Sequence, residues 1–144
     1  WHAGDFGYSK EIEENIEKFN IKGVYGNIDG KEIRTRYSKI LKFHCDKIKV
    51  LITHIGGYPN KYHPEIKEEI KRYNPDLYIC GHSHILKIMY DKKYNLLHIN
   101  PGAAGKEGFH QTRTMVLLEI SGKEIKNIQV VELGPRVKLA NSIN

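Results

Sequence analysis

Several short apolar segments of this chain each end beside glycine and polar side chains, and this pattern constrains the fold more than any other feature. The segments end near residues 2, 25, 53 and 80. The polar residues that follow them are Asp5, Asn27, His54, His82 and His84. Short apolar runs with flanking turn residues predict buried strands. Because loops converge over the carboxyl ends of strands in open α/β sheets, we expect these five side chains to lie close together.

Two helices are predicted between these strands. The first follows Ser9, a suitable N-cap residue, and its apolar side chains recur at helical spacing from Ile12 to Phe19. The second begins at Pro64, where the missing N–H of proline costs nothing. Between them, residues 37–44 and 48–53 are predicted to form a hairpin. The first half of the chain therefore alternates strand and helix.

The second half is predicted to be almost entirely strand. Further strands are expected at roughly 85–90, 94–99, 112–120 and 124–132. An alternating first half followed by a strand-rich second half predicts two packed sheets with helices outside, an α/β or α+β sandwich. The 144 residues contain no recognisable linker or repeat, so we expect a single domain over residues 1–144.

The formal net charge is +6, which suits an anionic substrate such as a phosphoester. The lysines are interspersed with glutamates, so we expect no dedicated nucleic-acid surface. No apolar run approaches the ~20 residues of a membrane-spanning helix, so we expect no membrane partner. Cys45 and Cys80 form no close-spaced motif, which fits a reducing cytoplasm and predicts a cytoplasmic location. The sequence leaves open whether the protein forms a homo-oligomer.

The polar residues at the strand ends combine carboxylate oxygen, amide oxygen and imidazole nitrogen. This set suits a borderline divalent ion such as Mn²⁺, Fe²⁺, Zn²⁺ or Ni²⁺. Five ligands that include a carboxylate able to bridge fit two ions ~3.5–4 Å apart. A lone buried histidine is more often structural than a ligand, and this alternative applies to His54 taken alone. Neighbouring glycines, which let the backbone turn sharply or approach a ligand, favour a metal site.

Four motifs in this order resemble those of the calcineurin-like metallophosphoesterases, most closely the small bacterial and archaeal phosphodiesterase branch. They are Gly26-Asn27-Ile28-Asp29, Thr53-His54-Ile55-Gly56-Gly57, Gly81-His82-Ser83-His84 and Asn100-Pro101-Gly102-Ala103. The branch shares its fold with a retromer scaffold subunit. The resemblance implies a four-layer α/β/β/α sandwich of two mixed sheets. It also implies phosphodiester hydrolysis by a hydroxide that bridges two divalent metals, manganese first among them, and attacks phosphorus in line.

The resemblance also assigns roles to single residues. Asp5 corresponds to the bridging carboxylate, Asn27, His54 and His82 complete the second metal site, and His84 serves the first. The family's remaining ligands come from an Asp-x-His pair on its first strand, and this sequence contains no Asp-x-His. We expect that the chain lacks its N-terminal strand and helix, so that the domain is incomplete. The alternative is a degenerate member with one metal position lost.

Two further positions concern catalysis. Many family members carry a general-acid histidine directly after the motif asparagine, where this sequence has Ile28. The adjacent Asp29 is expected to be a turn former. In the glycine-rich loop near residues 102–114, His110 and Arg113 are candidate contacts to a small phosphoester substrate, although an ordinary surface loop explains them equally well. The competing function is a catalytically weak or inactive scaffold that keeps the fold and binds a protein partner.

Overall fold

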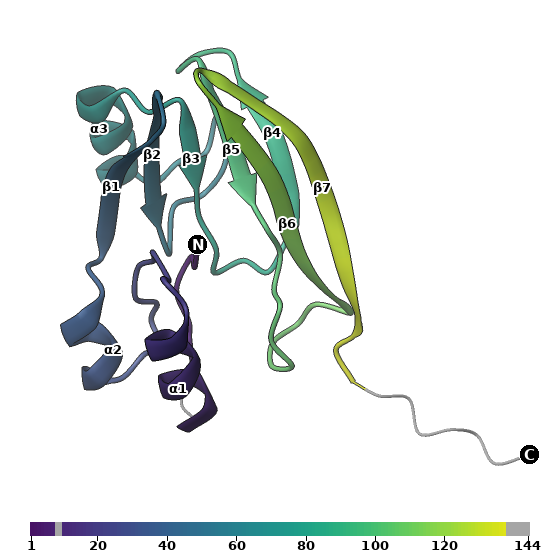
Figure 1. Ribbon diagram of the computed structural model, residues 1–144. Coiled ribbons are helices and arrows are strands. Elements are labelled where there is room, and N and C mark those ends of the chain that lie inside the picture. Colours follow the sequence, from purple (N-terminus) through teal and green to yellow (C-terminus); the bar gives the residue numbers. More distant parts are fainter. Residues whose placement is uncertain (8–9, 138–144) are drawn as a thin grey trace, which may run out of the picture.

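The computed structural model describes residues 1–7 and 10–137 as a mixed α/β fold (Figure 1). Its helices are α1 (Lys10–Lys18), α2 (Lys31–Arg36) and α3 (Pro64–Tyr73). Its strands are β1 (Ile40–Cys45), β2 (Ile48–Thr53), β3 (Leu77–Ile79), β4 (Lys87–Asp91), β5 (Leu96–Asn100), β6 (Thr112–Ser121) and β7 (Glu124–Pro135). None of the helices in these ranges is long and apolar enough to span a membrane.

Five strands form a mixed sheet in the order β1-β2-β3-β5-β4. The three central strands run parallel, whereas β1 and β4 pair antiparallel at the two edges. The strands β6 and β7 pair antiparallel as a separate two-stranded sheet. The predicted α/β class with two sheets is therefore confirmed, and the second sheet is antiparallel rather than mixed within the described residues.

The strand β2 is buried on both faces of the five-stranded sheet. On one face Leu51 packs with Ile66 and Ile70 of α3. On the opposite face Val50 and Ile52 belong to a second cluster, against which the apolar side chains of the β6–β7 sheet pack. This double burial explains why the segment is a nearly continuous apolar run. The layers seen are α3, the five-stranded sheet and the two-stranded sheet, while α1 and α2 lie together beyond one end of the larger sheet (Figure 1).

Most of the observed helices and strands agree with those predicted from the sequence. The expected strand near residues 23–25 is reduced to two isolated parallel bridges, from Gly23 to His2 and from Val24 to Ser38. The short helix α2 was not predicted, because its six residues are too few to show an apolar period. Ser9, the expected cap of the first helix, lies outside the described residues.

The parallel strands end on the side of the sheet where α1, α2 and the N-terminus lie (Figure 1).

The packing of β2 predicts a large effect for Leu51→Ala. Leu51 is fully buried between the sheet and α3, so the substitution should lower the free energy of unfolding by about 2–5 kcal/mol. Urea-induced unfolding measures this change. Leu117→Ala is the matched control, because Leu117 is 49% exposed, and it should change stability by no more than about 0.5 kcal/mol. Equal losses for both variants would contradict the described core.

Candidate metal centre

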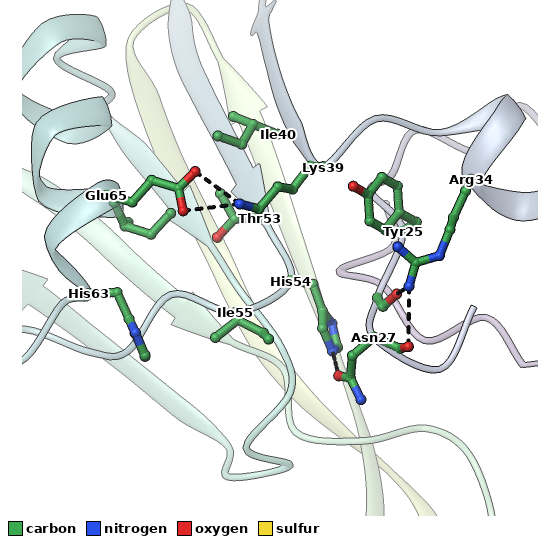
Figure 2. Close-up of a pocket in the computed structure, with 12 residues that line it drawn as sticks. Tyr25, Asn27, Arg34, Lys39, Ile40, Thr53, His54, Ile55, His63 and Glu65 are labelled. Atoms are coloured by element: carbon green, nitrogen blue, oxygen red, sulfur yellow. Dashed lines mark hydrogen bonds and ion pairs between the residues drawn. The ribbon is translucent and has the colours of Figure 1, made fainter. Parts of the chain in front are cut away.

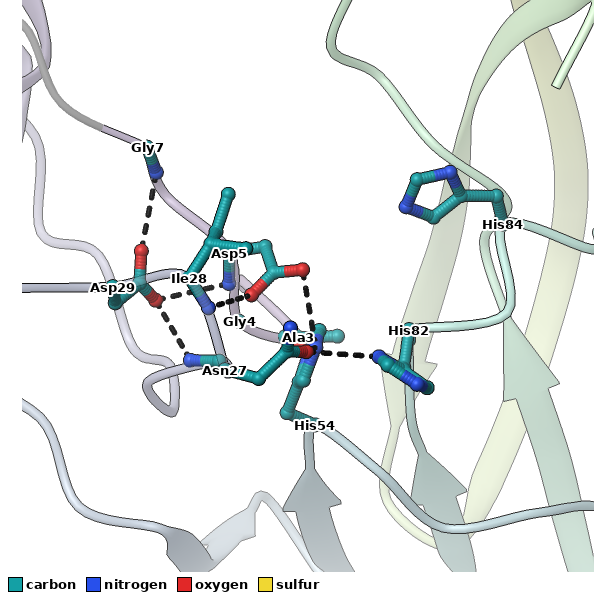
Figure 3. Close-up of polar contacts among 12 residues, drawn as sticks. Ala3, Gly4, Asp5, Gly7, Asn27, Ile28, Asp29, His54, His82 and His84 are labelled. Carbon is teal, nitrogen blue, oxygen red and sulfur yellow. Dashed lines mark hydrogen bonds and ion pairs between the residues drawn. The ribbon is translucent and has the colours of Figure 1, made fainter. Parts of the chain in front are cut away.

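Four of the five predicted ligands converge in one place at the carboxyl edge of the five-stranded sheet (Figure 3). One ligand atom from each of Asp5, His54 and His82 lies within 4.8 Å of the others. Asn27 joins them, because its Oδ1 is 2.9 Å from His54 Nε2 and 2.9 Å from His82 Nδ1. His54 directly follows β2 and His82 comes shortly after β3, so two parallel strands deliver both histidines to the same edge.

The tautomer of His54 follows from its surroundings. Its Nδ1 lies 2.7 Å from the carbonyl oxygen of Ala3, and a carbonyl oxygen can only accept a hydrogen bond. The proton of the neutral imidazole is therefore on Nδ1, and Nε2 presents a lone pair. Since the ring is buried, this hydrogen bond also holds its orientation. In this tautomer His54 directs Nε2 toward the centre.

The atoms around His54 Nε2 are also acceptors. Asp5 Oδ2 lies 3.2 Å from this nitrogen and Asn27 Oδ1 lies 2.9 Å from it. Lone pairs that face one another at these distances repel, unless a second proton or a cation is placed between them. Carboxylate, amide and imidazole groups are ligands of borderline divalent ions. The residues present therefore fit a metal ion at this point.

A buried carboxylate joins the two loops that carry Asp5 and Asn27. Asp29 is 4% exposed, and its carboxylate accepts hydrogen bonds from the backbone N–H groups of Asp5 (2.9 Å), Gly7 (3.1 Å) and Gly26 (2.7 Å). Hydrogen bonds to an ionised acceptor are among the stronger ones in proteins. Asp29 was expected to form a turn with Gly30 rather than to act in catalysis, but its carboxylate joins two loops. The sequence feature that could have indicated this role is the position of Asp29 two residues after Asn27.

The guanidinium group of Arg34 supports the same loop through its carbonyl groups. Nε donates to the carbonyl oxygen of Asp29 at 2.7 Å, and Nη2 donates to those of Gly26 and Asn27 at 3.1 and 3.2 Å. The guanidinium carbon also lies 4.5 Å from the centroid of the Tyr25 ring. Arg34 was not among the predicted site residues, because the helix α2 that carries it shows no apolar period in the sequence. Loop 26–29 is therefore held through the N–H of Gly26 by the carboxylate of Asp29 and through three of its C=O groups by the guanidinium of Arg34.

His2 and the glycines complete the support of Asp5. Gly4 donates its N–H to His2 Nδ1 at 3.2 Å, and the imidazole stacks on Phe6. Burial lowers the pKa of His2 to about 4, so the ring stays neutral and Nδ1 remains an acceptor. A Cβ atom at Gly26 would collide with the carboxylate of Asp5. This close approach explains why glycine precedes Asn27.

His84 lies apart from the four converging residues (Figure 3). It pairs with His110 instead. His110 Nε2 is 3.0 Å from the carbonyl oxygen of Gly105, so the proton of His110 is on Nε2 and its Nδ1 accepts. The two Nδ1 atoms are 3.3 Å apart, which places the proton of His84 on Nδ1 and leaves its Nε2 as a lone pair. Burial, followed by electrostatic interaction with the neighbouring His110 ring, lowers the pKa of His84. A neutral imidazole with a free Nε2 is suited to ligate a metal.

The loops after β3 and β5 are joined by buried Asn100. Its Nδ2 donates to the carbonyl oxygen of Gly81 at 2.9 Å and to Ser83 Oγ at 3.0 Å, next to both predicted histidine ligands. Of the two candidate substrate contacts, His110 holds His84, whereas Arg113 Nε donates to the carbonyl oxygen of Ala104 at 2.7 Å. Arg113 thus holds its own loop. The substrate roles of both residues stay predictions.

Comparison with known proteins identifies the family. Residues 1–123 match the model of the calcineurin-like phosphoesterase superfamily domain. The chain belongs to this superfamily. A search of the curated proteins gave no match.

Several solved structures share the fold of this phosphoesterase domain. An archaeal phosphodiesterase is 23% identical with a TM-score of 0.61, over 85% of this chain and 77% of that one. The zinc complex of Vps29 from Entamoeba histolytica is 17% identical with a TM-score of 0.63, over 87% and 76% of the two chains. A predicted phosphoesterase from Streptococcus pneumoniae is 18% identical with a TM-score of 0.56, over 78% and 70%. At these identities the likeness establishes the fold.

The contacts of Asp29 predict that Asp29→Asn weakens metal binding. An asparagine keeps one acceptor oxygen and replaces the other with a donor, so it cannot accept all three N–H groups. We expect the affinity for Mn²⁺ to fall by about 10–100-fold, measured by isothermal titration calorimetry. Asp46→Asn is the control, because that exposed carboxylate accepts a bond from Gly122 in a remote turn. Unchanged affinity in folded Asp29→Asn would refute a positioning role.

Proposed function

We propose that this phosphoesterase domain hydrolyses phosphodiesters with the help of two divalent metal ions, manganese first among them. The observation that carries the proposal is the convergence of oxygen and nitrogen atoms from Asp5, Asn27 and His54, a set that suits a divalent ion. Membership in the calcineurin-like superfamily supports a phosphoester as substrate. The fold shared with an archaeal phosphodiesterase supports a diester.

Each residue of the centre has a proposed role. Asn27, His54 and His82 would hold one ion together with Asp5, whose carboxylate would also reach a second ion on the side of His84. The N–H of Ile28 donates to Asp5 Oδ1 at 3.2 Å and so orients this carboxylate. When bound, the ions supply charge that stabilises phosphoryl oxygens, and they make water acidic enough to attack at neutral pH.

The position after Asn27 determines how the leaving group departs. Ile28 is 61% exposed and has no proton to give, at the position where many relatives carry a histidine. His110 has Nε2 engaged with Gly105 and Nδ1 engaged with His84, so it is not free to act as an acid in this arrangement. The leaving oxygen must then depart largely unprotonated or take its proton from water.

Metal content tests the proposed ligands. The purified protein should contain up to two transition-metal ions per chain by elemental analysis, and Asp5→Ala and His82→Ala should each lose at least one, because each removes a ligand from the centre. His44→Ala is the control, since His44 is exposed on β1, and it should keep the metal content. Unchanged content in the double variant Asp5→Ala/His82→Ala would refute the site.

The missing general acid predicts a steep dependence of rate on leaving-group acidity. Nitrophenyl diesters should be cleaved far faster than alkyl diesters in the presence of saturating Mn²⁺. Ile28→His should flatten this dependence if the new ring reaches the leaving oxygen at ~2.6–3.2 Å, whereas Ile28→Leu should leave it steep. A leaving-group series on the three proteins measures the slopes.

Two outcomes of this series would change the interpretation. A slope near zero for the unmodified protein would mean that another group supplies the proton. If the metal-loaded protein hydrolysed no ester at all, the scaffold hypothesis would replace the enzymatic one.

A further inference from the structure

A cavity of about 370 Å³ adjoins the candidate metal centre (Figure 2). Asn27 and His54 line both the cavity and the centre. The remaining walls come from the loop around Tyr25, from α2, from the start of β1, from the end of β2 and the residues after it, and from the start of α3. A molecule held at the metal centre can therefore extend into the cavity without leaving contact with the protein.

The lining of the cavity is largely apolar. Ile40, Ile55 and Ile66 contribute aliphatic surface from three different segments, and Tyr25 contributes an aromatic ring. Ile55 is 41% exposed, although it follows directly after a buried strand and histidine. Exposed apolar side chains that gather beside a polar centre are typical of a ligand pocket.

The charged groups of the cavity are already paired. Lys39 Nζ contacts both carboxylate oxygens of Glu65, at 2.9 and 3.0 Å. Arg34 donates through Nε and Nη2 to backbone carbonyl oxygens, and the hydroxyl of Thr53 is 2.7 Å from that of Tyr78. A second anionic group of a substrate would have to compete with these partners. The lining therefore favours an uncharged organic group.

We propose that this cavity binds an aromatic ester substituent of the phosphodiester substrate; this inference rests on the proposed function. The phosphoryl group lies at the metal centre, and the aromatic substituent packs against Ile40, Ile55 and the ring of Tyr25. An aromatic ring buries far more apolar area here than a methyl group, and its edge and face complement the stacked Arg34–Tyr25 pair.

The test compares two probes with the same phosphonate headgroup, phenylphosphonate and methylphosphonate. Their affinities for the manganese-loaded protein are measured by isothermal titration calorimetry, which requires no turnover. We expect phenylphosphonate to bind at least about tenfold more tightly, because only it fills the cavity. Equal affinities would overturn the proposal.

Variants of Ile55 locate the effect. Ile55→Trp should abolish the preference for the phenyl probe by filling the cavity, and Ile55→Ser should reduce it several-fold by removing apolar contact. Leu117→Trp is the matched control on an exposed strand position outside the cavity, and it should keep the preference. A preference that survives both Ile55 substitutions in folded protein would overturn the assignment.

The assay separates this inference from the proposed function. If nitrophenyl diesters are hydrolysed but the two probes bind equally, the cavity assignment fails and the enzymatic function stands. If no ester is hydrolysed but a phenyl preference exists that Ile55→Trp removes, the cavity assignment stands and the enzymatic function fails.

Discussion

The carboxylate of Asp29 is the constraint on which the candidate metal centre depends. It accepts three backbone N–H groups from two loops that are far apart in the sequence, and it is buried, so water competes little for these bonds. Arg34 acts on the carbonyl groups of the same segment. As a result, Asp5 and Asn27 are held with one side-chain oxygen each beside His54 Nε2.

The five-stranded sheet provides the other side of the centre. The strand β2 is buried by α3 on one face and by the β6–β7 sheet on the other. His54 directly follows this strand and is therefore attached to a rigid element. The bond from His54 Nδ1 to the carbonyl oxygen of Ala3 then joins this support to the N-terminal loop. The sheet thus positions His54 and His82, whereas Asp29 positions the loops that carry the side-chain oxygens of Asp5 and Asn27.

The pairing of His84 with His110 extends the same principle to the far side of the centre. A loop residue more than twenty positions away determines which nitrogen of His84 is protonated, and it leaves Nε2 available. This arrangement accounts for His110 without requiring that it touch a substrate. Together with the cavity beside Asn27 and His54, it outlines a centre with the candidate metal ligands in the middle and the cavity to one side.

The sequence alone determined the α/β class, most strands, the helix at Pro64 and the convergence of Asp5, Asn27, His54 and His82. These features follow from local patterns, since apolar periodicity marks buried elements and strand ends share one edge of a sheet. The roles of Asp29, Arg34 and His110 depended on the tertiary structure. Their partners lie on other segments, and no spacing along the chain records which backbone groups a side chain will meet. The separation of His84 from the other ligands, and the cavity that Ile40, Ile55 and Tyr25 enclose, were likewise decided only by how the loops pack around the sheet.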